Sequence, residues 1–255
     1  MPDLVVIAGP NGAGKSTAAP LVIGGLLGVA EFVNADVIAA GLSAFSPESV
    51  AVQAGRLMLK RLDELAGAGA DFAFETTLAS RSFAPWIEKL RRERGYRFHL
   101  IYLWLPEPED LVRRVARRVA LGGHSVPPEV IRRRYQRGLS NFLSLYRPIA
   151  DSWTLYENSS NARLVAMREV GGAEVVLDAE AWRMVEKSGK AREEERAYEA
   201  SGRTGGIMGV PIAEITAALH EAARDARRRH KAFGVPLVIR RDGKLVEVPP
   251  EEIEI

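Results

Sequence analysis

The segment GPNGAGKST, residues 9–17, constrains the fold of this chain more than any other feature. It follows a short apolar run, residues 3–8, and it matches the pattern G-x-x-x-x-G-K-[ST] in full. Glycines let such a loop wrap closely, so that successive backbone N–H groups point at phosphate oxygens. A helix that begins near Lys15 adds partial positive charge at its N-terminus. The segment therefore predicts a phosphate-binding loop between a buried strand and a helix.

Strand-like and helix-like segments alternate along the rest of the chain. Short apolar or branched runs predict strands at 3–8, 31–35, 71–75, 96–105, 154–158, 162–170 and 173–178. Helical spacing predicts helices from Lys15, over 47–65 and 81–94, from Asp110, from about 128 to 150 and over 179–199. This alternation predicts an α/β fold of the P-loop NTPase class, with a mainly parallel sheet covered by helices on both faces.

The helix that begins at Asp110 has an amphipathic pattern. We expect Val112, Val115 and Val119 to face inward, and Arg113, Arg114, Arg117 and Arg118 to face outward.

The composition changes after residue 200. SGRTGG, residues 201–206, is typical of a linker, and apolar residues then follow helical spacing at Ile212, Ile215, Leu219, Ala222 and Ala226. Two strand-like runs joined around Asp242–Gly243 predict a hairpin. We therefore expect a P-loop domain at 1–200, a linker at 201–209 and a small helix–hairpin module at 210–255. The module is too small for a confident core of its own, so we expect it to pack on the main domain or on a partner.

Composition excludes several classes of protein. The 255 residues contain no cysteine, which excludes disulfides and thiolate metal sites. No apolar run approaches the length of a membrane span, and the first residues lack the basic region of a signal peptide, so we expect a cytoplasmic protein. The net charge of +2 is too small to indicate nucleic-acid binding by itself.

The P-loop supplies the first candidate site residues. We expect the nucleotide, ATP or GTP, to be bound by Gly9, Pro10, Asn11, Gly12, Ala13, Gly14, Lys15, Ser16 and Thr17. In such loops the lysine reaches the β and γ phosphates and the serine hydroxyl ligates Mg²⁺, which assigns these roles to Lys15 and Ser16.

Two carboxylates follow strands that should end at the same edge of the sheet. Asp36, in VNAD, is placed to accept the proton of an attacking hydroxyl, or alternatively to cap the helix that follows. Glu75, in FAFETT, is placed to bind an acceptor hydroxyl or metal-bound water. Thr76 and Thr77 add hydroxyl groups there, with capping of the next turn as the alternative.

A lid is the third candidate feature. Residues 122–137 combine a glycine pair, a loop and a helix in which Arg134 and Arg137 share a face. Arginine can stabilise the charge of a transferring phosphoryl group. Arginines cluster over 91–137, but solvated helix faces explain most of them equally well. His124 is more often a structural residue than a catalytic one in such a loop.

Over about residues 3–185 the chain resembles the zeta-toxin-like P-loop kinases. The resemblance rests on GPNGAGKST, VNAD, FETTL, RVALGGHSVP, RRYQRGLSN and LYENS, in that order. It implies phosphorylation of a sugar hydroxyl of UDP-N-acetylglucosamine, in a toxin of a toxin–antitoxin pair. It places the general base on Asp36, acceptor binding on Glu75 and Thr77, the lid arginines on Arg134 and Arg137, and Asn158 near the nucleotide base.

The resemblance also bears on partners. Zeta toxins are inhibited by a helical antitoxin that blocks the nucleotide site, so either an antitoxin-like protein or the chain's own C-terminal module is a candidate regulator. The tail after residue 205 lies outside the kinase pattern.

Two other functions remain open from the sequence. A polynucleotide 5′-kinase would use the arginine cluster, and a nucleotide-gated binding protein would hydrolyse slowly and engage a partner through the C-terminal module. A motor of the AAA type is disfavoured, because the chain lacks room for the usual helical lid domain.

Overall fold

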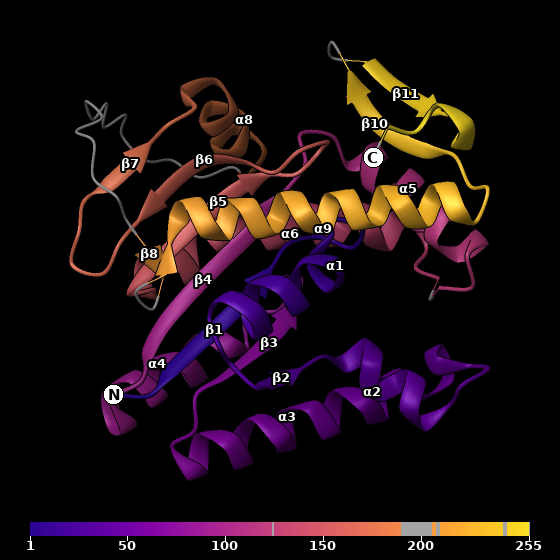
Figure 1. Cartoon of the computed structure of the whole chain (residues 1–255). Helices are drawn as coiled ribbons and strands as arrows, with labels where there is room; N and C mark the ends of the chain where they lie inside the picture. The colour runs from indigo at the N-terminus through magenta and orange to yellow at the C-terminus, as the bar shows by residue number, and fades with distance from the viewer. Residues whose placement is uncertain (124, 190–205, 208–209, 242–243, 255) are drawn as a thin grey trace.

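The computed structural model describes residues 1–123, 125–189, 206–207, 210–241 and 244–254, and its main feature is a seven-stranded sheet (Figure 1). The strand order is β2-β3-β1-β4-β5-β6-β7. The bounds are β1 Asp3–Ala8, β2 Glu31–Val33, β3 Phe72–Thr76, β4 Arg97–Trp104, β5 Ser152–Glu157, β6 Arg163–Arg168 and β7 Glu174–Val176. Strands β1 to β5 pair in parallel, and β6 and β7 pair antiparallel at one edge. The predicted fold class is confirmed.

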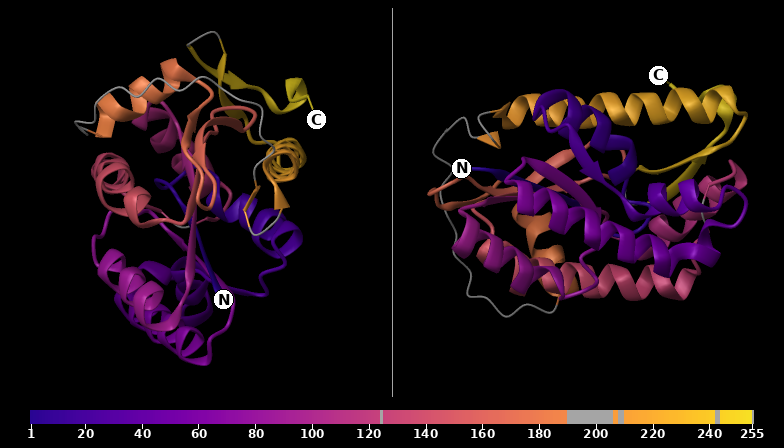
Figure 2. Two further views of the ribbon diagram at one scale, coloured as in Figure 1. Left: turned by 90° about the vertical axis from the view of Figure 1, so that its left-hand side faces the viewer. Right: turned by 90° about the horizontal axis from the view of Figure 1, so that it is seen from below.

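Helices cover both faces of the sheet (Figure 2). In the first part of the chain they are α1 Lys15–Ala19, which continues as the π-helix η1 Pro20–Leu26, then α2 Ala35–Leu42, the 3₁₀ turn η2 Pro47–Val50, α3 Ala51–Ala68 and α4 Phe83–Arg94. There follow α5 Pro108–Ala120, α6 Pro128–Asn141, the π-helix η3 Phe142–Tyr146, α7 Arg147–Ile149 and α8 Ala179–Gly189. The predicted helix over 179–199 is described only as far as Gly189.

Strands β1 and β4 lie at the centre of the sheet, and this position explains their composition. Every residue of β1 is buried, as are the seven residues of β4 after Arg97. Strands that are covered on both faces read as near-continuous apolar runs, which is the pattern at 3–8 and 96–105. Because β1 to β5 are parallel, the loops after β1, β2, β3 and β5 all open at the same edge of the sheet, where such folds bind ligands.

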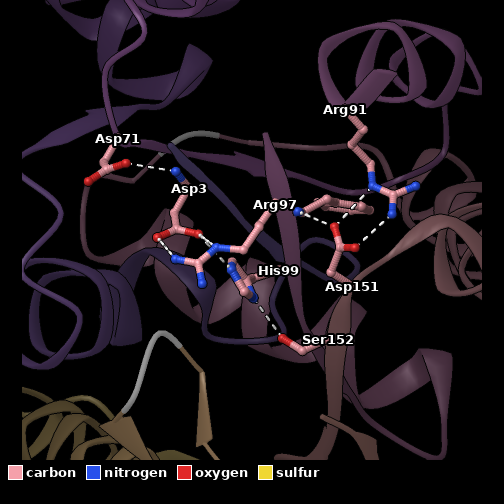
Figure 3. A network of polar contacts seen from close by, with 8 residues as sticks. Asp3, Asp71, Arg91, Arg97, His99, Asp151 and Ser152 are labelled. Atoms are coloured by element: carbon pink, nitrogen blue, oxygen red, sulfur yellow. Dashed lines mark hydrogen bonds and ion pairs between the residues drawn. The ribbon is translucent and has the colours of Figure 1, made fainter. Parts of the chain in front are cut away.

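The opposite edge, at the amino ends of the strands, carries a structural polar network (Figure 3). Arg97 forms a bidentate pair with Asp3, with both contacts at 2.7 Å. His99 Nε2 lies 3.0 Å from Asp3 Oδ1, and His99 Nδ1 lies 2.7 Å from Ser152 Oγ. Burial lowers the pKa of His99, although its contact with Asp3 opposes the shift. This network joins β1, β4 and β5 far from the P-loop.

The C-terminal module packs on the main domain, as expected from its size. It consists of the short pair β8 Gly206–Ile207 and β9 Val210–Pro211, helix α9 Ile212–Ala232, the hairpin β10 Leu237–Arg241 and β11 Lys244–Val248, and the 3₁₀ turn η4 Pro250–Glu252. Helix α9 lies along α1 and η1 (Figures 1 and 2). Its apolar stripe is confirmed, because Ile215, Leu219 and Ala222 are buried.

Two details of this region refine the expectations from sequence. Residues 206–207, which we expected in a linker, pair with β9 as β8. The other residues of the expected linker lie outside the described residues. So does the predicted hairpin turn at Asp242–Gly243.

Helix α5 is rotated from the predicted orientation. Its buried side chains include Leu111 and Val115, whereas Val119 is exposed. Arg113 is exposed as expected, but Arg114, Arg117 and Arg118 line a cavity. The pattern of valines misplaced the apolar face because it left out Leu111.

Along the part of the chain described here, no helix is long and apolar enough to cross a membrane.

Candidate active site

The P-loop is held in shape by glycines and by a side chain from a distant strand. Gly14 has φ = +94°, a left-handed conformation that favours glycine, and it precedes the first residue of α1. Asn158, just after β5, donates from Nδ2 to the carbonyl oxygen of Ala13 at 2.8 Å. A Cβ on Gly14 would lie 2.8 Å from that same nitrogen. Asn158 therefore fixes the P-loop, in addition to lining the cavity at its mouth.

Lys15 is buried at the start of α1, and its ammonium group lies between two kinds of oxygen. Nζ donates to the carbonyl oxygen of Pro10 at 3.0 Å and lies 3.5 Å from Glu75 Oε1. Burial lowers the pKa of Lys15, while the carboxylates of Glu75 and Asp36 act in the opposite direction. A buried ammonium group with incomplete compensation is well suited to bind an anion such as a phosphate.

Glu75 connects the P-loop to the neighbouring strands. Its Oε2 accepts hydrogen bonds from Ser16 Oγ at 2.8 Å and from Asn34 Nδ2 at 2.7 Å. Strand β3 places this carboxylate opposite the start of α1 because β3 pairs with β1 in register, Ile7 opposite Glu75. Residues from three adjacent loops thus meet at one carboxylate.

Asp36 lies in the first turn of α2 but does not cap it. The cap is Asn34, whose Oδ1 accepts from the backbone N–H of Asp36 at 2.8 Å and from that of Val37 at 3.4 Å. The carboxylate of Asp36 is exposed and lines the same cavity as Lys15 and Glu75. The capping alternative for Asp36 is wrong, and its side chain is left for contact with a ligand.

Thr76 and Thr77 shape the turn after β3. Thr76 Oγ1 accepts from the backbone N–H of Leu78 at 3.2 Å, and Thr77 Oγ1 accepts from that of Ala79 at 3.4 Å. Leu78 has φ = +53°, which these hydroxyl contacts help to support. A hydroxyl can also donate a hydrogen bond. Both threonines therefore remain able to donate to a substrate that accepts the phosphoryl group.

The two predicted lid arginines occupy different environments. Arg134 is half-buried, and its Nη1 donates to Asn11 Oδ1 in the P-loop at 3.1 Å. Burial lowers the pKa of Arg134, and the nearby Asp36 opposes this. Arg137 is exposed, and neither Arg134 nor Arg137 is among the residues that line the cavity at the P-loop. His124 lies outside the described residues.

A cavity of about 360 Å³ is lined by residues of the P-loop together with Asp36, Glu75 and Asn158. Its floor includes the P-loop and Asp36 and Glu75, and one wall is formed by Arg114, Arg117 and Arg118 of α5. We had expected these arginines to face solvent. Their common spacing, 114, 117 and 118, was the signal that they share one helical face. Burial lowers the pKa of Arg114, which donates to the carbonyl oxygen of Ser159.

Other arginines of the 91–137 cluster are structural. Arg91 forms a bidentate pair with Asp151, at 2.7 and 3.0 Å (Figure 3), and Arg132 pairs with Glu109 at 2.7 and 2.9 Å. The charges of Arg91 and Arg132 are therefore matched by carboxylates of the same chain.

The donor set at the P-loop fits a magnesium ion. Mg²⁺ takes oxygen ligands and is usually held by one or two carboxylates together with substrate phosphates and water. The hydroxyl of Ser16 and the carboxylates of Glu75 and Asp36 are among the oxygen groups that line the cavity with Lys15.

Comparison with protein families identifies the core of this domain. The model of the AAA_33 family, described as an AAA domain, matches residues 4–142, which include the P-loop, Asp36, Glu75 and helix α6. The chain belongs to this family. Its kinase-like P-loop domain is therefore shown by sequence as well as by fold.

The described residues that follow the matched segment do not form a separate helical lid domain. After residue 142 the described residues form η3 and α7, β5 to β7, α8 and the C-terminal module.

Among sequence relatives, an uncharacterised protein of Haemophilus influenzae is 27% identical over 131 residues, which are 51% of this chain and 91% of that protein.

Two solved structures share the fold. The AvrRxo1-ORF1:ORF2 complex with ATP gives a TM-score of 0.60 at 18% identity, covering 89% of this chain and 80% of the matched chain. A chain of the PezAT chromosomal toxin–antitoxin system of Streptococcus pneumoniae gives a TM-score of 0.53 at 15% identity, covering 76% and 81%.

Proposed function

We propose that this protein is a small-molecule kinase that transfers the γ-phosphate of ATP or GTP to an acceptor hydroxyl. The observation that carries the proposal is that Asp36 and Glu75 line one cavity with Lys15 and Ser16 of the P-loop. A loop that only bound a nucleotide would need the ammonium group of Lys15 and the hydroxyl of Ser16, but not the two carboxylates. Asp36 is an exposed carboxylate that does not cap its helix, and such a group can accept the proton that a transfer to a hydroxyl releases.

Each side chain has a role in the proposed transfer. Asp36 accepts the proton as the acceptor oxygen attacks the γ-phosphorus, and the bond to the β–γ bridging oxygen breaks to release the nucleoside diphosphate. Lys15 and Arg134 stabilise the negative charge on the phosphoryl oxygens. Glu75 orients Ser16 and Lys15 and, with Thr76 and Thr77, borders the acceptor. Gly9 to Thr17 and Asn158 form the phosphate cradle.

Magnesium is the implied metal. Ser16, with Asp36 and Glu75 nearby, would hold it, and it would neutralise charge on the β and γ phosphates.

The acceptor that we propose is the sugar hydroxyl of UDP-N-acetylglucosamine, on the strength of the motif resemblance from VNAD to LYENS. The fold shared with a chain of a toxin–antitoxin system supports a further proposal, that an antitoxin-like protein or the C-terminal module regulates the site. The polynucleotide alternative has less support, because Arg91 and Arg132 of the cluster are paired with carboxylates of the same chain.

The proposal is tested by incubating the full chain with γ-labelled ATP, Mg²⁺ and either UDP-N-acetylglucosamine or an oligonucleotide with a free 5′-hydroxyl. Label on the sugar nucleotide is the expected result. Label on the oligonucleotide would move the acceptor to the polynucleotide class, and label only in free phosphate would contradict the kinase proposal.

A further inference from the structure

The cavity at the P-loop does not end at the kinase domain. The same cavity of about 360 Å³ is lined at its other side by α9 and by β10 of the C-terminal module. The P-loop binds the phosphates of a nucleotide, and the rest of the cavity offers room for the nucleoside beside them. Its volume lies within the usual range for small-molecule sites.

Helix α9 presents small apolar side chains to this cavity. Ala222, Ala223 and Ala226 line it, together with Leu219 one turn earlier. Alanines leave a flat, shallow wall where larger side chains would fill the space. Strand β10 adds Leu237 and Ile239, so that the cavity has apolar surfaces from two elements of the module. A planar base, apolar on its faces, is the part of a nucleotide that fits such walls.

Polar groups surround these walls. Arg227 and His230 of α9 and Ser160 of the loop after β5 line the same cavity. Ser159 lines it too, and its hydroxyl oxygen is buried with no hydrogen-bond partner among the residues described. Ligand sites commonly combine apolar walls with a few polar groups that fix orientation.

The module is fastened to the domain on both sides of the cavity. Tyr156 and Thr216 share a hydrogen bond of 3.2 Å, His220 Nε2 lies 2.6 Å from the carbonyl oxygen of Ala162, and Arg227 donates to Asn161 at 2.8 Å. On the other side, Arg117 of α5 pairs with Glu247 of β11. These contacts hold α9 and the hairpin as fixed walls rather than as a loosely attached tail.

We propose that the C-terminal module is part of the nucleotide site, and that α9 and β10 form the subsite that binds the base and ribose of the donor nucleotide. The inference rests on the proposed function for the phosphate end of the cavity. It assigns residues 210–241 a role in substrate binding in addition to any regulatory role.

The test compares ATP with inorganic tripolyphosphate. Both ligands carry three phosphates, but only ATP carries the base and ribose that the proposed subsite would bind. Their dissociation constants are measured by calorimetry on the full chain for the wild type, for Ala226→Phe, which places a ring in the subsite, and for Ala217→Phe as a control. Ala217 is exposed on the same helix. A second variant, Ala223→Leu, guards against a local folding defect at residue 226.

The proposal predicts that Ala226→Phe and Ala223→Leu weaken ATP binding about tenfold or more, because a filled subsite loses the contacts of the nucleoside. Tripolyphosphate binding should stay within about twofold of wild type, since the P-loop is untouched, and Ala217→Phe should change neither constant.

Unchanged ATP affinity in both cavity variants would overturn the inference, as would tighter ATP binding, which would identify α9 as a block on the site. If the wild type bound neither ligand, the P-loop assignment itself would fail, and the subsite with it. If it bound both but transferred no phosphate, the base subsite would stand without the kinase.

Discussion

Ser16 Oγ donates a hydrogen bond of 2.8 Å to Glu75 Oε2, which ties the first turn after the P-loop to the end of a neighbouring strand. The same carboxylate holds Asn34, the cap of α2, and lies beside Lys15. Glu75 therefore coordinates the positions of the lysine, the serine and the helix that carries Asp36. Substitution of Glu75 should therefore destabilise the nucleotide-free protein more than the nucleotide-bound protein.

We predict that Glu75→Gln lowers the free energy of unfolding of the nucleotide-free protein by about 1–3 kcal/mol, because the buried Lys15 loses its charged partner. Urea unfolding with and without ATP measures the effect. The stabilisation on adding ATP should exceed that of wild type, since the triphosphate supplies the missing negative charge.

The matched control for Glu75→Gln is Glu31→Gln, which removes one member of an exposed pair with Arg61. Its effect should stay below about 1 kcal/mol. Equal effects of the two substitutions would contradict the role given to Glu75.

The two lid arginines should separate in kinetics. Arg134 contacts Asn11 in the P-loop and lies near Asp36, so Arg134→Ala should lower kcat by about 10²–10³ with a smaller effect on nucleotide affinity. Arg137 is exposed, and Arg137→Ala should cost less than about tenfold, because an exposed charge is screened. Steady-state kinetics on both variants checks this, and a reversed order would assign the lid function to the other arginine.

Helix α6 approaches the turn after β3 so closely that only glycine fits at one position. A Cβ on Gly138 would lie 2.4 Å from the carbonyl oxygen of Thr77. We predict that Gly138→Ala lowers the free energy of unfolding by about 1–3 kcal/mol, because backbone must move. The control is Gly55→Ala in α3, where an added Cβ meets nothing within 4 Å. This substitution should raise the free energy of unfolding by about 0.4–1 kcal/mol. Denaturant unfolding that gives both variants the same sign would refute the prediction.

The network in Figure 3 should make stability depend on pH through His99. Burial lowers the pKa of His99 in the folded protein below its ordinary value near 6.5. Below about pH 6.5 the unfolded chain therefore binds a proton that the folded protein does not, so stability is fully present above that pH and decreases as the pH falls.

The comparison for this prediction is His99→Gln, which keeps groups able to bond Asp3 and Ser152 but does not titrate. Unfolding at pH 7.5 and pH 5.5 should show a larger loss for wild type than for His99→Gln. Equal losses would mean that His99 does not carry the effect. The other titrating groups are the same residues in the two proteins, so the difference between the losses reports on His99 and on the carboxylates beside it.

The mainly parallel sheet, the P-loop and the meeting of Asp36 with Glu75 were predictable from sequence, because parallel strands bring their carboxyl ends to one edge. The order of the strands within the sheet was not predicted. The contacts that individual arginines make were not predictable from sequence. Arg114 and Arg91 have the same sequence character, yet one lines the cavity and the other pairs with Asp151, sixty positions away along the chain. Ion pairs between distant segments leave no local pattern.

The position of α9 shows the same limit. Its apolar stripe predicted that it packs, but nothing in the periodicity named α1 and η1 as its partners or placed Ala226 beside the P-loop cavity. The rotation of α5 was missed because valines alone were taken as its inward face, although Leu111 is among its buried residues.

The measurement that tests the central claim most directly is phosphoryl transfer from γ-labelled ATP to UDP-N-acetylglucosamine and a panel of other nucleotide sugars by wild type and Asp36→Asn. ATP affinity is measured on the same samples. The account predicts a phosphorylated sugar nucleotide with wild type, and a loss of about 10²–10⁴ in kcat for Asp36→Asn while ATP still binds as in wild type. Transfer that survives undiminished in Asp36→Asn, or a wild type that releases only free phosphate, would contradict it.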